Sequence, residues 1–162
     1  VQLLGSGTIL REVETAAEQL EKEWAVSADV WSATSFNELR RDMDDCERWN
    51  RLNPGKKKRT CYVAECLSEK RGPVIASTDY VRLYADQIRA AVPGKYRVLG
   101  TDGFGRSDTR KALRSFFEVN SAHIVVAALQ SLADNGELPG KMVSEAIKKY
   151  GIDGSKPNPA TV

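Results

Sequence analysis

Two glycine-rich segments have residue types and spacing that could bind a phosphate. The first, Gly5-Ser6-Gly7, follows the apolar run Val1–Leu4 and precedes a helical pattern, which is where dinucleotide-binding folds place a pyrophosphate. However, Leu10 replaces the third glycine of the G-x-G-x-x-G fingerprint. The acidic residue that would hold a ribose should close the second strand, whereas Asp29 stands at its start. These departures favour a tight turn with close helix packing over a dinucleotide site.

The second segment, Gly103 to Asp108, follows Asp102 and fails the same test, because Asp108 stands where the third glycine should be. It also lacks the lysine of a P-loop. Its polar residues are dense, and two interpretations stay open. One is a capped turn held by an Asp–Arg pair within the polar group Asp102, Arg106, Ser107, Asp108 and Arg110. The other is a surface that meets another domain or subunit.

Both segments together form the candidate site, a domain interface or an anion-binding loop. Its residues are Gly5, Ser6, Gly7, Asp102, Gly103, Phe104, Gly105, Arg106, Ser107 and Asp108. No catalytic, cofactor-binding or metal-binding residue is predicted. The one histidine, His123, falls in an apolar helical segment, where a core or interface role is favoured over a general base. The three cysteines contain no C-x-x-C pair of the kind that binds zinc.

Charge and composition argue against nucleic acid and membrane partners. The formal net charge is +2, from 24 basic and 22 acidic residues, so no strong long-range field is expected. The basic run Lys56–Arg59 has no interleaved aromatic residues that could stack bases. We see neither a signal peptide nor a run approaching the roughly 20 apolar residues that span a bilayer. An odd number of cysteines in a chain of this size suits a reducing cytoplasm.

The elements that must position these loops alternate between strand and helix. Each glycine segment follows a predicted strand and precedes a predicted helix, as expected for parallel strands joined by helical crossovers. We therefore expect a three-layer α/β fold, with a mostly parallel sheet of about five strands and helices on both faces. Strands are predicted at 1–4, 28–34, 73–78 and 96–100, and helices at 9–24, 35–52 (broken), 62–67, 79–92, 108–117, 122–132 and 141–150.

Side-chain caps are predicted for several of these helices. Ser35 with Glu38 forms a capping-box pattern, and Asp79, Asp108 and Ser121 are expected to cap the helices that follow them. The segment 122–132 is ambiguous between strand and helix, although its cap and alanine-rich centre favour helix. It is apolar nearly all round, so we expect it to be buried on more than one side or to supply an interface.

Residues 1–152 are expected to form a single domain and 153–162 an irregular C-terminal tail. The chain opens directly into a predicted strand at Val1 without a methionine. We therefore expect a boundary inside a longer protein, with upstream cofactor-binding domains absent from this chain.

Several motifs resemble the C-terminal domain of the homodimeric bacterial pyruvate dehydrogenase E1 family. The most specific run is Tyr96 to Asp108, which includes an Asp-x-Phe-Gly-x-Ser pattern also similar to the transketolase C-terminal domain. Departures from the family's pattern are the basic insertion at 54–59 and the cysteines Cys61 and Cys66. The resemblance covers essentially the whole chain. The other matching segments are 1–7, 31–36, 46–50, 77–80, 87–89 and 156–159.

The resemblance implies a scaffold and dimerisation domain of a thiamine diphosphate- and Mg²⁺-dependent enzyme. In that family the parent decarboxylates pyruvate and reductively acetylates the lipoyl group of its E2 acetyltransferase partner. The implied partners are the rest of the E1 chain and a second E1 subunit, and this chain itself is expected to bind no cofactor. Two alternatives remain open: the C-terminal domain of another thiamine-dependent enzyme of the transketolase type, and a regulatory module that binds a small anion at the glycine loops.

Overall fold

Four parallel strands form the single sheet of this protein, whose computed structural model describes residues 1–162. The strands are β1 (Gln2–Gly5), β2 (Asp29–Ser32), β3 (Val74–Ser77) and β4 (Tyr96–Leu99), in the spatial order β2-β1-β3-β4. β1 lies at the centre, with Gln2 opposite both Asp29 and Val74. The expected three-layer α/β fold is confirmed, with four strands where about five were expected.

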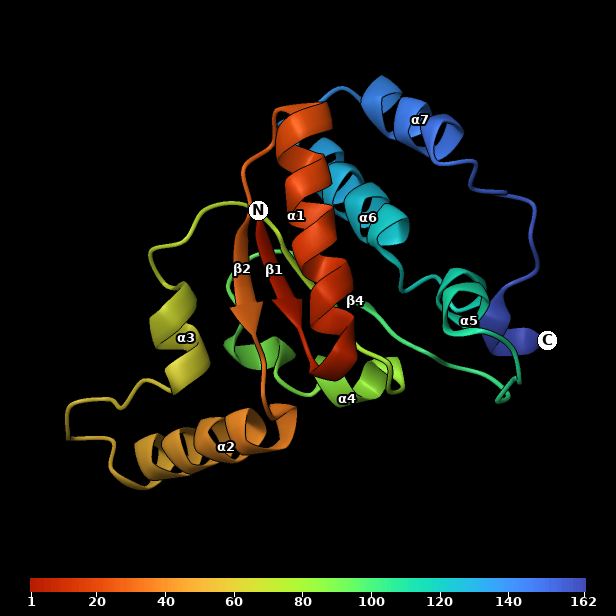
Figure 1. The fold of residues 1–162 in the computed structure, drawn as a ribbon. Helices are drawn as coiled ribbons and strands as arrows, with labels where there is room; N and C mark the ends of the chain where they lie inside the picture. The colour runs from red at the N-terminus through yellow and green to blue at the C-terminus, as the bar shows by residue number, and fades with distance from the viewer.

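Helices cover both faces of this sheet (Figure 1). One face packs against α1 (Leu10–Trp24) and α6 (Ser121–Asp134), and α7 (Gly140–Lys149) packs on α6. The other face packs against α2 (Phe36–Leu52), α3 (Tyr62–Leu67) and α4 (Arg82–Asp86). The remaining helix, α5 (Arg110–Phe116), follows the second glycine segment. Short 3₁₀ turns occur at Gly7–Ile9, Arg89–Ala91 and Pro159–Thr161.

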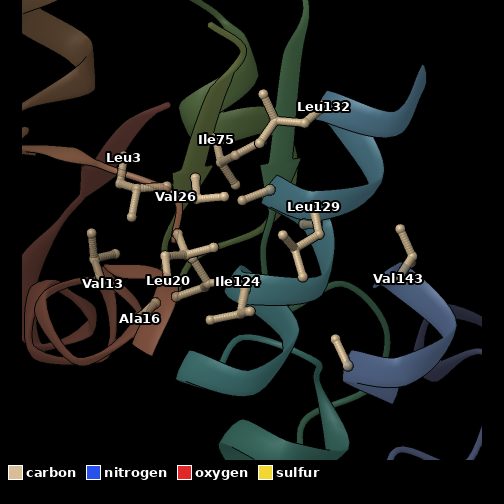
Figure 2. Packing of buried hydrophobic residues seen from close by; sticks show 14 of the residues in the cluster. Leu3, Val13, Ala16, Leu20, Val26, Ile75, Ile124, Leu129, Leu132 and Val143 are labelled. Carbon is tan, nitrogen blue, oxygen red and sulfur yellow. The ribbon is translucent and has the colours of Figure 1, made fainter. Parts of the chain in front are cut away.

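The two hydrophobic cores are separate and lie on opposite faces of the sheet, with 16 and 11 buried residues. Figure 2 shows the larger one, where Leu3 and Ile75 from the sheet lie among side chains of α1, α6 and α7. Successive side chains of β1 point to opposite faces of the sheet, so Leu3 lies in the larger core and Leu4 in the smaller one. Strands buried on both faces explain the unalternating apolar runs in the sequence.

The all-round apolar segment is the helix α6, as the sequence favours, and its apolar sides are covered largely within this chain. It packs between α1, the sheet and α7, so it is a core helix rather than an exposed interface. The stretch Arg110–Asp134, 25 residues, is long and apolar enough by length and composition to cross a membrane. In the structure a turn between α5 and α6 interrupts this stretch, and the burial of α6 accounts for its composition.

Several predicted helix starts differ from the structure. α2 is continuous rather than broken, and the Ser35 hydroxyl accepts a bond from the Glu38 amide, as expected for its cap. The predicted helix 79–92 is reduced to α4 and a 3₁₀ turn, and Val81 rather than Asp79 stands at the cap position of α4. The caps predicted at Asp108 and Ser121 are each one residue off: the side chains of Thr109 and Asn120 accept the capping bonds.

Candidate functional site

Loops that follow β1, β3 and β4 meet at the carboxyl edge of the sheet and enclose a cleft of about 570 Å³. Ligands in parallel α/β sheets bind at this edge because loops and helix starts gather there. Figure 1 shows the arrowheads of β1 and β2 pointing towards the side where α4 lies. We call this space the carboxyl-edge cleft. Its polar lining includes Thr8, Asp79, Thr101, Arg106, Arg110 and Arg114.

The first glycine segment shapes the approach to the cleft but contributes little to its lining. A Cβ on Gly5 would lie 2.8 Å from the Cα of Leu10, so only glycine allows the strand to turn this closely against the helix. The buried Ser6 hydroxyl donates to the Thr78 hydroxyl at 2.9 Å, which joins the ends of β1 and β3. The geometry therefore agrees with a tight turn and close helix packing.

Asp102 forms an ion pair, but with an arginine outside its own loop. Its carboxylate accepts a bond from the Arg82 amide at 3.1 Å and pairs with the Arg82 guanidinium. This carboxylate therefore satisfies the first turn of α4, the role that the sequence assigned to Asp79. The Asp79 carboxylate instead accepts a bond from the Thr8 hydroxyl at 3.3 Å.

The C-terminal tail fixes the loop at Gly103. Here φ is +104°, and a Cβ would lie 2.2 Å from the carbonyl oxygen of Pro159. Earlier in the tail, Lys156 donates to the carbonyls of Ser115 and Phe116 at the end of α5 and pairs with Glu118 at 3.3 Å. The tail is therefore irregular, as expected, but it packs against the candidate site.

The remaining loop residues are exposed, and two cations there have no acidic partner. Arg106 lies over the Phe116 ring, 5.0 Å from its centroid, and neither Arg106 nor Arg110 forms an ion pair. The Asp108 carboxylate accepts a bond from the Thr109 amide at 2.6 Å. Both arginines line the carboxyl-edge cleft together with Asp108, whereas Ser107 is exposed outside it.

Arg114 anchors α5 to the first helix. Its guanidinium pairs with Glu12 at 2.7 Å, and these side chains are only 16% and 22% exposed. The second oxygen of Glu12 accepts a bond from the Ser121 amide at 2.9 Å, so one carboxylate joins α1, α5 and α6. Arg114 also reaches the Thr8 hydroxyl at 3.3 Å, which ties this network to the wall of the cleft.

Beside the cleft, apolar side chains are exposed on α4 and on the second glycine loop. Leu83 is 74% exposed and Phe104 is 78% exposed, and Tyr80 and Val81 are more than half exposed. A bond from the Thr101 amide to the Tyr80 carbonyl at 2.8 Å joins the two segments. We call the set Tyr80, Val81, Leu83, Phe104, Arg106 and Arg110 the carboxyl-edge surface. Exposed aromatic residues with arginine are typical of protein interfaces.

His123 lies apart from this cleft, in a smaller pocket of about 190 Å³ beside the tail. Its Nδ1 atom lies 2.6 Å from the Asn120 side-chain oxygen, so the neutral ring donates there. Burial lowers the pKa of His123 below its usual 6.5, and the Lys156 charge lowers it further, against an opposing effect of Glu118. The predicted core or interface position agrees with this burial.

The residues present do not fit a thiamine diphosphate–Mg²⁺ site. No group of three or more histidine, cysteine, aspartate or glutamate side chains is arranged to bind a metal ion. At the first glycine segment, an Asp79 carboxylate oxygen lies 3.8 Å from the position of a Cβ on Gly7 and would repel a diphosphate. The cysteines Cys46, Cys61 and Cys66 are free thiols.

Sequence reasoning missed several residues of this region. Arg114 and Glu12 meet although they are 102 residues apart, and no local pattern signals such a pair. Pro159 was assigned to a tail without a role, yet it meets the second glycine loop. The exposed apolar residues Tyr80, Val81 and Leu83 stand within the predicted helix 79–92, where the apolar stripe includes Val81 and no motif marks Tyr80 or Leu83 as surface contacts.

The fold and this edge define a C-terminal domain of the transketolase type, and the chain belongs to the transketolase-like C-terminal domain family, which it matches over residues 1–120. Its fold is similar to that of a solved split-gene transketolase, described as an inactive β4 tetramer. The TM-score is 0.55 and the identity 16%, over 82% of this chain and 39% of that one.

Much higher identity links the chain to pyruvate dehydrogenase E1 components. It is 65% identical over 160 residues to the one from Pseudomonas aeruginosa and 57% identical over 162 residues to the one from Cupriavidus necator. The Escherichia coli K12 protein is 55% identical over 160 residues. These matches cover 98–100% of this chain but only 18% of each relative, so the chain spans about a fifth of their length.

Proposed function

We propose that this chain is the C-terminal structural and dimerisation domain of a pyruvate dehydrogenase E1 component. The observation that carries the proposal is the 65% identity to the Pseudomonas aeruginosa E1 component over 98% of the chain. A domain of this family with no metal cluster and no nucleophile–base pair at its sheet edge fits a supporting role. The chemistry then belongs to the remainder of the longer enzyme.

The activity of the whole enzyme is part of the same proposal. The longer E1 chain binds thiamine diphosphate and Mg²⁺ outside these 162 residues, decarboxylates pyruvate and acetylates the lipoyl group of the E2 acetyltransferase. Its partners are a second E1 subunit and E2. The free thiols support a cytoplasmic location, because a reducing compartment keeps cysteines unpaired.

The carboxyl-edge surface is the part of this domain that packs on the rest of E1. Leu83 and Phe104 are exposed by about three-quarters, so a partner surface would remove apolar area from water there. Arg106 and Arg110 have no acidic partner within this chain and are free to pair with carboxylates across the interface.

A chimera tests the proposal directly. The corresponding segment of the Pseudomonas aeruginosa E1 component is replaced by this chain, and thiamine diphosphate-dependent reduction of ferricyanide by pyruvate is measured. We expect the chimera to retain the dimeric state and most of the activity, and an E1 lacking the segment to lose both. A folded, dimeric chimera without activity would contradict the proposal.

The isolated chain provides the complementary measurement. With pyruvate, thiamine diphosphate and Mg²⁺ added, we expect no decarboxylation, since no cofactor site is formed by these residues. Turnover by the purified chain would overturn the assignment of a purely structural role.

A small-anion module is the second candidate, and the two unpaired arginines in the carboxyl-edge cleft favour it. Calorimetric titration of the chain with phosphate, nucleotides and pyruvate tests it, and no heat with any of them would exclude it. A transketolase-type parent is disfavoured, because identity to the split-gene transketolase is 16% against 65% for the Pseudomonas aeruginosa E1 component.

A further inference from the structure

One face of α2 holds the segment that leads into α3. Asp42, Cys46 and Asn50 stand four residues apart, so they lie along one face of the helix. The Asn50 side chain forms two bonds with the backbone of Arg59: it donates to the carbonyl at 2.9 Å and accepts from the amide at 2.8 Å. The Asp42 carboxylate accepts a bond from the Tyr62 amide at 2.7 Å. The segment between these contacts therefore runs antiparallel to α2 (Figure 1).

This alignment places Cys61 opposite Cys46. The helix rises by about 12 Å between the two contacts, and an extended segment covers about 10 Å between the same contacts. Cys46 lies midway between the contacts on the helix, and Cys61 is one of the two residues between them on the segment. Its backbone is extended, with φ at −75° and ψ at 156°.

The Cys61 side chain points towards α2. Alternate side chains of an extended segment lie on one side of it. Arg59 pairs with Asp45 at 3.7 Å and lies over the Trp49 ring, 4.4 Å from its centroid, so the Arg59 side chain faces α2. Cys61 is two residues further along and is 7% exposed, whereas the intervening Thr60 is exposed.

The distance between the two backbones is compatible with a disulfide. Asp42 and Asn50 reach the segment through short side chains and hydrogen bonds of 2.7–2.9 Å, so the backbones lie roughly 6 Å apart. Disulfides usually join Cα atoms about 4.4–6.8 Å apart. Burial raises the pKa of the Cys46 thiol, and the charges of Asp42 and Cys61 raise it further. The effect of Cys61 is a second indication that the two thiols are neighbours.

The two thiols differ in their access to solvent. Cys46 is partly exposed and Cys61 is buried, and both are reduced in the structure. A dissolved disulfide therefore meets Cys46 first, and Cys61 is positioned to attack the mixed disulfide that forms. This is the arrangement of a reacting thiol beside a resolving thiol.

We propose that Cys46 and Cys61 are a site of reversible thiol–disulfide exchange with glutathione disulfide. The Cys46 thiolate attacks one sulfur of glutathione disulfide, whose S–S bond breaks as a bond from Cys46 to glutathione forms and one glutathione thiolate leaves. The Cys61 thiolate then attacks the Cys46 sulfur and displaces the second glutathione. The two thiol protons pass to the released glutathione thiolates, and the two electrons lost by the protein reduce glutathione disulfide to two thiols.

The bond would close a loop that contains the basic run Lys56–Arg59. That run is exposed, and the disulfide would restrain it against α2. In a reducing compartment the pair remains a dithiol, so the bond forms only when the glutathione pool becomes oxidised. The site shares no residue with the carboxyl-edge cleft or the carboxyl-edge surface, and it does not depend on the proposed E1 function.

Peptide mapping without reductant tests the pair. The 162-residue chain is incubated with about 1 mM glutathione disulfide at about pH 8.5, where more thiolate is present, and free thiols are then alkylated. Trypsin cuts after lysine and arginine, so Cys46 and Cys61 fall in separate peptides, 42–48 and 60–70. We expect mass spectrometry to find these peptides joined, and reductant to separate them. A glutathione adduct at Cys46 without the joined peptides would overturn the proposal.

The second peptide also contains Cys66, so matched variants identify the bond. We expect Cys66→Ser to form the joined peptides and Cys61→Ser to form none. Fragmentation of the joined peptides from the unsubstituted chain locates the bond without any substitution. A bond to Cys66, or a disulfide-linked dimer in place of the intramolecular bond, would refute the assignment.

Limited proteolysis measures the restraint on the loop. We expect trypsin to cut the native chain at Lys56–Arg59 at least about threefold more slowly after oxidation than before it, because the bond opposes local opening. In Cys61→Ser the rate should be the same under both conditions. Equal rates in the oxidised and reduced unsubstituted chain would show that the bond does not restrain the loop.

Discussion

At the scale of single residues, Gly103 connects the candidate site to the C-terminal tail. With φ at +104° and the Pro159 carbonyl oxygen 2.2 Å from a Cβ position, Gly103→Ala must strain the loop or displace the tail. We expect it to lower the free energy of unfolding by about 1–3 kcal/mol, measured by urea denaturation. Gly105→Ala is the matched control, because nothing lies within 4 Å of its Cβ position. Equal effects would show that the tail contact is unimportant.

His123 should make the stability depend on pH. Its pKa is lowered by burial, so the unfolded chain binds a proton more readily than the folded chain does just below pH 6.5. The free energy of unfolding therefore rises as the pH is raised through this window. It falls as the pH is lowered, because the buried ring of the folded chain is then forced to protonate. We expect the stability of the native chain, relative to His123→Gln, to decrease from pH 7.5 to pH 5.5.

Thermal or urea unfolding of both proteins across this range gives the difference. The two share their carboxylates and amino terminus, so the difference isolates the imidazole. A difference that does not change with pH would show that burial of the ring has no energetic consequence.

At the scale of elements, the position of α5 depends on Glu12. Glu12→Ala removes the carboxylate that pairs with the Arg114 guanidinium and accepts a bond from the Ser121 amide, in a largely buried position. We expect a loss of about 1.5–3 kcal/mol in the free energy of unfolding, together with faster hydrogen exchange in α5. Glu14→Ala, exposed on the same helix, should change stability by less than about 0.5 kcal/mol. A loss of similar size in both would argue that α1 helicity, rather than the bridge, is being measured.

The strands β1 and β3 were predictable because each is an unbroken, largely apolar run that is buried on both faces. The helix starts were predictable only to within a few residues. For α4, the carboxylate that satisfies the first turn belongs to Asp102, 20 residues away, so no local pattern could identify it. For α5 and α6, adjacent polar residues compete for the cap, and only the backbone angles decide between them.

The candidate site was predictable in part. The two glycine segments face one edge because the carboxyl ends of parallel strands meet there, which the alternation of strands and helices implies. The pairing of Asp102 with Arg82 and of Glu12 with Arg114 depends on how helices cross the sheet, which periodicity does not specify. The contact of Pro159 with Gly103 depends on the path of an irregular tail, for which the sequence offers no pattern.

At the scale of the whole molecule, the carboxyl-edge surface should matter only in the longer enzyme. Leu83→Ser with Phe104→Ser removes exposed side chains, so the isolated chain should lose less than about 0.5 kcal/mol per substitution. In an E1 chain that contains this domain, we expect at least about tenfold weaker dimer association by sedimentation equilibrium. Leu52→Ser, 59% exposed at the end of α2, is the control. Unchanged association in the double variant would place the interface elsewhere.

The central place of β1 in the sheet has a consequence for how the chain folds. Its residues pair with β2, 27 positions later, and with β3, 72 positions later, as in Gln2 with Asp29 and Val74. The sheet therefore consists of contacts distant in sequence, whose closure costs chain entropy before burial compensates it. During synthesis the first strand must wait for β3 to emerge, so we expect α1 to form early and the sheet to assemble late, in one cooperative step.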